Sequence, residues 1–179
     1  MLRYVAFLRG INLGRRRLEM GRLRGHFEEL GLEDVETFLA SGNVVFRAAP
    51  GSQSALEARI EAHLAGALGY EVDTFLRSLA ELEEVARFDG LPPGEGGGWT
   101  PHVVFLREPA GESVVQRLRE LETEDDRFVA RGREVYWLRR GGLTDSVVSA
   151  ADLARALGGA THTMRNLNTV RRIVQKFAP

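Results

Sequence analysis

Apolar residues recur at two spacings along the first half of the chain, and these spacings predict its elements. Alternating or short continuous apolar runs are typical of strands, which we expect at 3–8, 35–40, 44–47 and 70–77. Apolar residues three or four positions apart indicate helices, which we expect at 19–30 and 54–68. The order is β-α-β-β-α-β, that of the ferredoxin-like split β-α-β unit.

The second half of the chain follows a similar pattern. Strands are expected at 102–106, 127–130 and 134–139, and helices at 112–121 and from the capping box Ser149–Asp152. Where a fourth strand is due, the sequence reads "GGATHTMRNLNTVRRIVQKF", which we interpret as a Gly-rich break followed by a final helix. We therefore predict an α+β protein of two tandem ferredoxin-like units with antiparallel sheets, the second ending in a C-terminal helix.

The distribution of proline and glycine along the chain predicts where the domains begin and end. A capping box at Ser78–Glu81 opens a short helix that runs to Arg87. The stretch "FDGLPPGEGGGWTP" that follows has the composition of a linker. We expect domain one at 1–87, the linker at 88–101 and domain two at 102–179.

Composition narrows the class of protein. The chain has 179 residues, 44% of them hydrophobic, which is enough to bury a core. It has no Cys, which excludes disulfides, thiolate nucleophiles and Cys-based zinc sites. The N-terminus is short and interrupted by Arg, and no apolar run reaches about 18 residues, so we expect a cytoplasmic bacterial protein with no membrane association.

Charge is distributed unevenly. The net charge of −1 argues against a general nucleic-acid coat. Residues 1–24 nevertheless hold seven Arg against Glu19 alone, and residues 140–179 hold six bases against Asp145 and Asp152. Since all but one of the bases are Arg, a GC-rich genome explains the preference for Arg over Lys, although it does not explain the clustering.

Topology predicts one edge where these charges gather. In a split β-α-β unit, the end of the first strand, the start of the first helix and the turn between strands two and three lie together. Here these are the loop Arg9–Leu18 and the turn Ser41–Asn43. Unpaired N–H groups before a helix favour an anion, and Arg9 and Arg15–Arg17 would reinforce it. The plainer interpretation is a solvated basic loop with a good hairpin turn, in which Gly10 and Gly14 reverse the chain and Asn12 caps a turn.

The same argument applies to the second unit. Its edge would gather the loop 107–111, the turn 130–133 and the segment 161–166, and with them Arg107, Arg131, Arg133, His162 and Arg165. If the two edges face one cleft, the site lies between the domains. Helix capping alone could explain Thr163 and Asn166, and a single His such as His162 is more often a surface residue.

Catalytic and metal-binding motifs are scarce. The sequence has no Ser elbow, HExxH, Walker loop or GxGxxG, and "EDD" at Glu124–Asp126 is typical of a solvated loop. His26 and His63 fall inside predicted helices and His102 begins a strand, and their spacing is not that of metal ligands. We expect no metal and no cofactor, and the catalytic residues, if any, are unknown.

Three stretches carry a family resemblance. "YVAFLRGINLG", "LEMGRLRGHFEELGLEDVETFLASGNVVF" and "MRNLNTVRRI" together resemble the domain-of-unknown-function family 1697. The resemblance implies ferredoxin-like units and no established activity. It places Arg9, Gly10, Asn12, Ser41, Gly42 and Asn43 in one motif block, and Arg165, Asn166 and Thr169 in another. Arg15 stands where the family pattern has a second Gly, which makes this loop more basic.

Our leading hypothesis is a small anionic ligand, bearing phosphate or carboxylate and with nucleotides among the candidates, bound at the edge of domain one near the domain interface. The contacts would come from both motif blocks, with Arg15, Arg16, Arg17 and His162 as secondary candidates. The alternatives are nucleic-acid binding through the basic ends, hydrolysis of a phosphate ester or acyl phosphate, and a protein–protein adaptor. The RNP1 pattern is missing, and adjacent Tyr136 and Trp137 would point to opposite faces of a strand. The hydrolase alternative rests on fold-level analogy with acylphosphatases.

Overall fold

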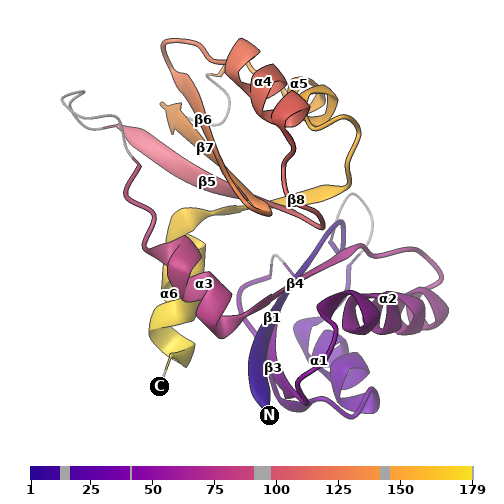
Figure 1. Cartoon of the computed structure of the whole chain (residues 1–179). Coiled ribbons are helices and arrows are strands. Elements are labelled where there is room, and N and C mark those ends of the chain that lie inside the picture. Colours follow the sequence, from indigo (N-terminus) through magenta and orange to yellow (C-terminus); the bar gives the residue numbers. More distant parts are fainter. Residues whose placement is uncertain (13–16, 41, 91–97, 142–145, 179) are drawn as a thin grey trace. The chain divides into compact units, whose positions relative to one another are not determined.

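The computed structural model of the chain describes residues 1–12, 17–40, 42–90, 98–141 and 146–178 (Figure 1). Within these ranges the order β-α-β-β-α-β-α occurs twice. The first repeat comprises β1 (Leu2–Leu8), α1 (Met20–Glu29), β2 (Glu33–Thr37), β3 (Asn43–Ala48), α2 (Gln53–Leu68), β4 (Thr74–Ser78) and α3 (Leu79–Ala86). The second comprises β5 (Trp99–Leu106), α4 (Glu112–Glu120), β6 (Asp126–Arg131), β7 (Glu134–Arg140), α5 (Ala150–Ala156), β8 (His162–Asn166) and α6 (Leu167–Phe177).

Each repeat builds one antiparallel sheet. The strand orders are β2-β3-β1-β4 and β6-β7-β5-β8, and every neighbouring pair is antiparallel. These orders are those of the split β-α-β unit. The structure therefore confirms the predicted fold class, including the C-terminal helix that ends the second unit.

The expected break before the last helix is wrong, because the segment contains a fourth strand. β8 pairs with β5 over its whole length, from His102↔Asn166 to Leu106↔His162, and runs directly into α6. Among the described strands, β8 lies at the edge of its sheet and pairs with β5 on one side only. Because its other side has no strand beside it, an edge strand tolerates polar side chains. Its composition, "HTMRN", therefore hides the alternation that identifies a strand.

The two units share their hydrogen-bond register. Val5 at the middle of β1 is paired with Arg77 of β4, and Val103 at the middle of β5 is paired with Arg165 of β8. The repeat is therefore a repeat of backbone positions, although the sequences of the two units share little more than their pattern. It allows residues of β1 and β4 to be compared with counterparts in β5 and β8, whereas β2 has a register shift that β6 lacks.

Each unit has a core on the helical face of its sheet. In the first unit, Leu23 and Phe27 of α1 and Ile60 and Leu64 of α2 are fully buried, each pair one helical turn apart. They pack on the β1 side chains Tyr4, Ala6 and Leu8. Burying an aliphatic or aromatic side chain of this size contributes about 1.5–3 kcal/mol. In the second unit, the corresponding cluster joins Val104 and Leu106 to helix side chains that include Leu118 and Leu153.

The chain divides into two compact units that do not follow the sequence strictly. Unit 1 comprises residues 1–84 together with 173–179, and unit 2 comprises residues 85–172. The end of α6 is held in unit 1 by Arg3, whose Nη1 donates to the Phe177 carbonyl oxygen at 2.6 Å, and by an edge contact between the Phe38 and Phe177 rings. Of the segment predicted as a linker, 91–97 lie outside the described residues, and β5 begins at Trp99 rather than at His102. Among the described helices, none combines the length and apolar character needed to cross a bilayer.

Candidate anion site at the end of β1

The loop after β1 lies against the turn before β3, as the topology predicted. The Leu8 N–H donates to the Gly42 carbonyl oxygen at 2.8 Å, and the Asn12 Nδ2 donates to the Ala40 carbonyl oxygen at 3.3 Å. Unit 2 repeats this link, since the Leu106 N–H donates to the Arg133 carbonyl oxygen at 2.9 Å. Arg15, Arg16 and Ser41 of the predicted site lie outside the described residues.

The Asn12 side chain hydrogen-bonds to two segments of the backbone around it. Its Oδ1 accepts from the Leu18 N–H at 2.7 Å, while its Nδ2 reaches Ala40. One side chain thus ties both the end of the loop and the neighbouring turn to the end of β1. Each such hydrogen bond contributes about 1 kcal/mol, so Asn12 holds the backbone of the site in place.

Asn43 and Gly42 shape the turn. Asn43 is fully buried, its Nδ2 donates to the Phe38 carbonyl oxygen at 2.8 Å, and its own carbonyl accepts from the Phe38 N–H at 2.8 Å. Gly42 has φ +73°, and a Cβ built on it would lie 2.7 Å from Ile11 Cγ2. The site therefore needs glycine at 42 and uses Asn43 to close the turn.

Arg9 has the exposed guanidinium of this edge. Its Nη1 lies 3.4 Å from Asp73 Oδ2, and both side chains are well exposed to solvent. The Arg9 N–H also donates to the Asp73 carbonyl oxygen at 2.9 Å, which fixes the backbone of Gly10, whose φ is +73°. Exposed ion pairs contribute about 0–1 kcal/mol, so Arg9 can exchange Asp73 for another anion at little cost.

The N-terminus of α1 follows the same loop. Glu19 precedes the helix with extended backbone but makes no side-chain hydrogen bond to it, and the first turn has no acidic residue. The first N–H groups of a helix have no partner within the helix and carry the positive end of its dipole. Arg17 and Arg22 nearby are both exposed. This combination of donors and cations favours an anion.

A pocket beside Asp73 has the opposite character. Its lining includes three carboxylates, from Glu61, Glu71 and Asp73, together with Ala62, Ala65 and Val72. Glu61 is already engaged, because its Oε1 accepts from the Thr74 N–H at 2.7 Å. An anion would be repelled there, which restricts the candidate site to the loop itself.

The second motif block lies in unit 2, where its polar groups serve β8 and α6. Arg165 is half-buried, and its Nη1 donates to Thr163 Oγ1 at 2.8 Å and to the Met164 carbonyl oxygen at 2.9 Å. Burial lowers the pKa of Arg165 to about 10, so it is still charged at neutral pH. Asn166 Oδ1 accepts from the Asn168 N–H at 2.8 Å at the start of α6, the capping role foreseen as the plainer interpretation. Thr169 is half-buried in α6, and His162 Nδ1 lies 3.0 Å from the Ala160 carbonyl oxygen.

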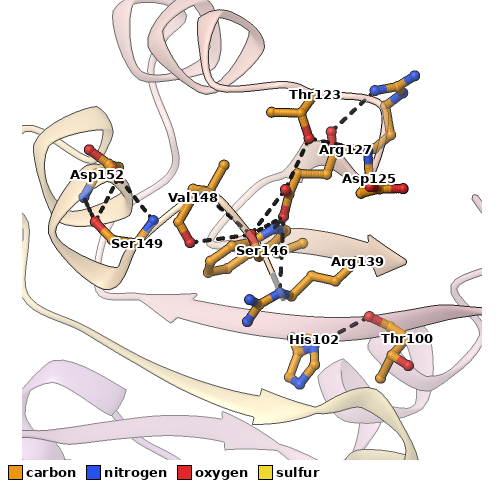
Figure 2. Close-up of polar contacts among 12 residues, drawn as sticks. Thr100, His102, Thr123, Asp125, Arg127, Arg139, Ser146, Val148, Ser149 and Asp152 are labelled. Carbon is orange, nitrogen blue, oxygen red and sulfur yellow. Dashed lines mark hydrogen bonds and ion pairs between the residues drawn. The ribbon is translucent and has the colours of Figure 1, made fainter. Parts of the chain in front are cut away.

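Sequence reasoning missed a buried polar cluster around Asp126, and the expectation of a solvated loop at Glu124–Asp126 is wrong for this residue. Asp126 has no exposed surface and accepts from Trp137 Nε1 at 2.7 Å, Ser146 Oγ at 2.8 Å and Thr123 Oγ1 at 3.0 Å. Arg139 lies beside it, with Nε 4.0 Å from Asp126 Oδ1 (Figure 2). Such a fully hydrogen-bonded carboxylate is typical of a structural network.

His102 lies on β5 in the same view of unit 2. Its Nδ1 is 3.3 Å from the Thr100 carbonyl oxygen, and burial lowers its pKa below the ordinary value of 6.5 (Figure 2). A neutral, buried imidazole held by its own strand is consistent with a packing role.

Comparison with known proteins identifies one family and a similar solved structure. A family described as "Protein of unknown function (DUF1697)" matches residues 1–136. A conserved bacterial protein, SP0830 from Streptococcus pneumoniae, is 26% identical, with a TM-score of 0.73 over 100% of this chain and 99% of its own. No curated protein matches this chain.

Proposed function

Because the chain belongs to the DUF1697 family, which is of unknown function, we propose its function from the geometry of the loop after β1. The protein binds a small ligand that carries a phosphate or carboxylate group, and nucleotides are among the candidates. The ligand lies against Arg9 and the N-terminus of α1. The observation that carries the proposal is the exposed, weakly paired guanidinium of Arg9, whose own N–H donates to the Asp73 carbonyl oxygen.

Hydrogen bonds at the two described ends distinguish this loop from an ordinary basic surface. Hydrogen bonds from Leu8 to Gly42 and from Leu18 to Asn12 hold the loop at both ends. Residues whose backbone is already held by hydrogen bonds lose little conformational entropy when they bind a ligand. Arg9 can then grip an oxyanion at two points while the first N–H groups of α1 bind another oxygen.

The residues divide between contact and support. Arg9, Gly10 and Arg17 supply contacts in this proposal, and the sequence-based candidates Arg15, Arg16 and Ser41 are kept as further contacts. Asn12, Gly42 and Asn43 act as positioning residues, because their side chains or backbone are engaged within the loop and turn. Arg165, Asn166 and Thr169 stay a sequence-based hypothesis for ligand contact, and in the proposal they serve the fold of unit 2.

Isothermal titration with inorganic phosphate, AMP, ATP, glucose 6-phosphate and citrate at low salt tests this proposal. We expect saturable binding of at least one of them, at least about tenfold weaker in Arg9→Ala, and weakened by added KCl. Arg24→Ala is the matched control, since Arg24 is an exposed Arg of α1 paired with Glu28, and it should leave the affinity unchanged. Binding of none of these ligands, or equal affinity in wild type and Arg9→Ala, would contradict the assignment.

The alternatives receive less support. A hydrolase of the acylphosphatase kind would need the Asn43 amide at the surface to orient a water, whereas Asn43 is fully buried. Nucleic-acid binding would need exposed aromatic rings, whereas Tyr136 and Trp137 are both buried, and burial raises the pKa of Tyr136 to about 12. The buried Asn43 amide and the buried aromatic rings therefore favour neither function over the binding of a small anionic ligand.

A further inference from the structure

Two histidines and a glutamate meet between α1 and α2, the helices that cover one face of the unit 1 sheet (Figure 1). His26 Nδ1 lies 3.3 Å from Glu29 Oε2, and His63 Nε2 lies 3.0 Å from the same oxygen. The ligand atoms of the three residues all lie within 4.8 Å of one another. His26 and Glu29 are near the end of α1, so this cluster is distinct from the loop at its start.

We propose that His26, Glu29 and His63 form a binding site for a divalent transition-metal ion such as Zn²⁺. The ligands are His26 Nδ1, His63 Nε2 and the Glu29 carboxylate. Nothing in this assignment depends on the proposed anion site.

The distances fit a metal ion closely. Ligand atoms about 2 Å from a zinc ion at tetrahedral angles lie about 3.4 Å apart. The observed 3.0 and 3.3 Å between the imidazole nitrogens and Glu29 Oε2 are close to that value, and the third separation, between the two nitrogens, is at most 4.8 Å. The two imidazole rings are 5.6 Å apart between centroids and meet edge to face, which keeps them from blocking one another.

The helices that carry the ligands are held together. Phe27, the residue after His26, packs in the core of unit 1. Ile60 and Leu64, which flank His63 in the sequence of α2, pack in the same core. The Arg59 guanidinium, one turn before His63, donates to the Leu30 carbonyl oxygen at the end of α1. Binding therefore does not require the helices to move.

The donor set selects the class of metal. Two imidazoles and one carboxylate suit Zn²⁺, Ni²⁺, Co²⁺ and Cu²⁺, whereas Mg²⁺ and Ca²⁺ prefer oxygen ligands. Three protein ligands leave at least one position for water or a small molecule, as in exchangeable rather than structural zinc sites. Glu29 is exposed, so the ion can enter from solvent.

The plainer interpretation is that Glu29 merely pairs with two histidines. Both imidazole nitrogens approach the same carboxylate oxygen, Glu29 Oε2, and this arrangement serves either hydrogen bonding or coordination of a metal. Within the described residues the other nitrogen of His26, Nε2, is buried without a hydrogen-bond partner. Its Nδ1 faces Glu29, as the proposed coordination requires.

The chain has only four His, which makes a direct test practical. Tag-free protein is titrated with ZnCl₂ while the imidazole nitrogens are followed by proton–nitrogen NMR, with His26→Gln and His63→Gln used for assignment. We expect the signals of His26 and His63 to move in a saturable way and those of His102 and His162 to stay in place. MgCl₂ should move none of them.

Calorimetry with Zn²⁺ gives the matched comparison. Glu29→Gln and His63→Gln should each weaken binding at least about tenfold. Glu28→Gln should bind as wild type does, because Glu28 pairs with Arg24 and not with the histidines. The absence of saturable Zn²⁺ binding, undiminished affinity in His63→Gln or Glu29→Gln, or a shift at His162 instead would overturn the proposal. Since His63 and Glu29 lie at the surface, their variants keep the test valid even if His26→Gln fails to fold.

Discussion

Arg77 of β4 and Arg165 of β8 occupy the same position in the two units. Each is paired in register with the central Val of the first strand, Val5 or Val103. The Nη1 of each donates to the carbonyl oxygen of the preceding residue, at 2.7 Å to Leu76 and at 2.9 Å to Met164. Arg77 is almost entirely buried, so its contact serves the fold. Because Arg165 makes the same contact at the equivalent position, we infer a structural role for Arg165 as well.

This equivalence predicts that Arg77→Ala and Arg165→Ala both lower the free energy of unfolding. Each substitution removes a hydrogen-bonding side chain, buried at Arg77 and half-buried at Arg165, so we expect a loss of about 2–4 kcal/mol, larger for Arg77. Urea denaturation followed by circular dichroism measures it. Arg24→Ala is the control, since its exposed i,i+4 pair with Glu28 contributes only about 0.3–0.5 kcal/mol.

If only Arg77→Ala lowered the free energy of unfolding, the two arginines would not be equivalent. Unchanged stability in Arg165→Ala would instead favour the functional role that the family motif block suggested. The two results therefore separate a scaffold residue from a ligand contact without any knowledge of the ligand.

Gly42 and Gly31 allow a second comparison. Both have positive φ, of +73° and +71°, but a Cβ at 42 would lie 2.7 Å from Ile11 Cγ2 whereas one at 31 meets nothing within 4 Å. The left-handed conformation alone costs a residue with Cβ about 1–2 kcal/mol. Only Gly42→Ala adds overpacking to this cost. We therefore expect Gly42→Ala to lower the free energy of unfolding by about 3 kcal/mol and Gly31→Ala by about 1 kcal/mol, measured by thermal or urea unfolding. Equal costs would mean that the loop and turn are not pressed together.

Asp126 should be the most sensitive acid of unit 2. Asp126→Ala removes the acceptor of the buried Trp137 Nε1–H and one acceptor of the Ser146 hydroxyl, and it removes the carboxylate beside Arg139. We therefore expect a loss of about 3–5 kcal/mol in urea unfolding. Asp125→Ala is the adjacent control, because the Asp125 carboxylate is exposed and lies 3.9 Å from Arg140 Nε. That control should change stability by less than about 1 kcal/mol. Similar effects of the two substitutions would show that the buried network contributes little.

Sequence pattern predicted the parts of the fold that topology determines. Strand and helix order is enough to place Leu8 beside Gly42, because the split β-α-β connection leaves one arrangement for that edge. It could not predict that Asn43 turns inward to Phe38, since both an exposed and a buried Asn fit an "SGN" turn. The juxtaposition of the loop and the turn was therefore predicted, and the inward orientation of Asn43 was not.

Long-range burial explains the other misses. Asp126 is buried by Trp137 and Ser146, which lie on a different strand and in a distant loop, and an acidic run such as "EDD" has no local mark of burial. His26 and His63 are brought together by the packing of two helices, so their separation along the chain concealed their proximity. Both contacts depend on tertiary structure that no spacing rule for a single element contains.

The pH dependence of the α5 capping box is the last prediction. Ser149 and Asp152 bond each other reciprocally, Ser149 N–H to Asp152 Oδ2 at 2.9 Å and Asp152 N–H to Ser149 Oγ at 3.1 Å. Hydrogen bonding from the Ser149 side chain, then from its backbone, then from Arg155, lowers the pKa of Asp152 from 3.8 to about 2. Because the folded-state pKa is the lower one, the stabilisation is complete above pH 3.8 and is lost as the pH falls through about 2.

NMR titration of the Asp152 carboxyl carbon from pH 5 downward measures this directly. We expect a midpoint near pH 2 in the wild type, a marked rise toward 3.8 in Ser149→Ala and a smaller rise in Arg155→Ala, following the order of the contributions. Amide exchange at the start of α5 should quicken below about pH 3 in the wild type, and at all pH values in Ser149→Ala. A wild-type midpoint close to 3.8, or a larger rise in Arg155→Ala than in Ser149→Ala, would mean that the ion pair and not the capping box holds the carboxylate.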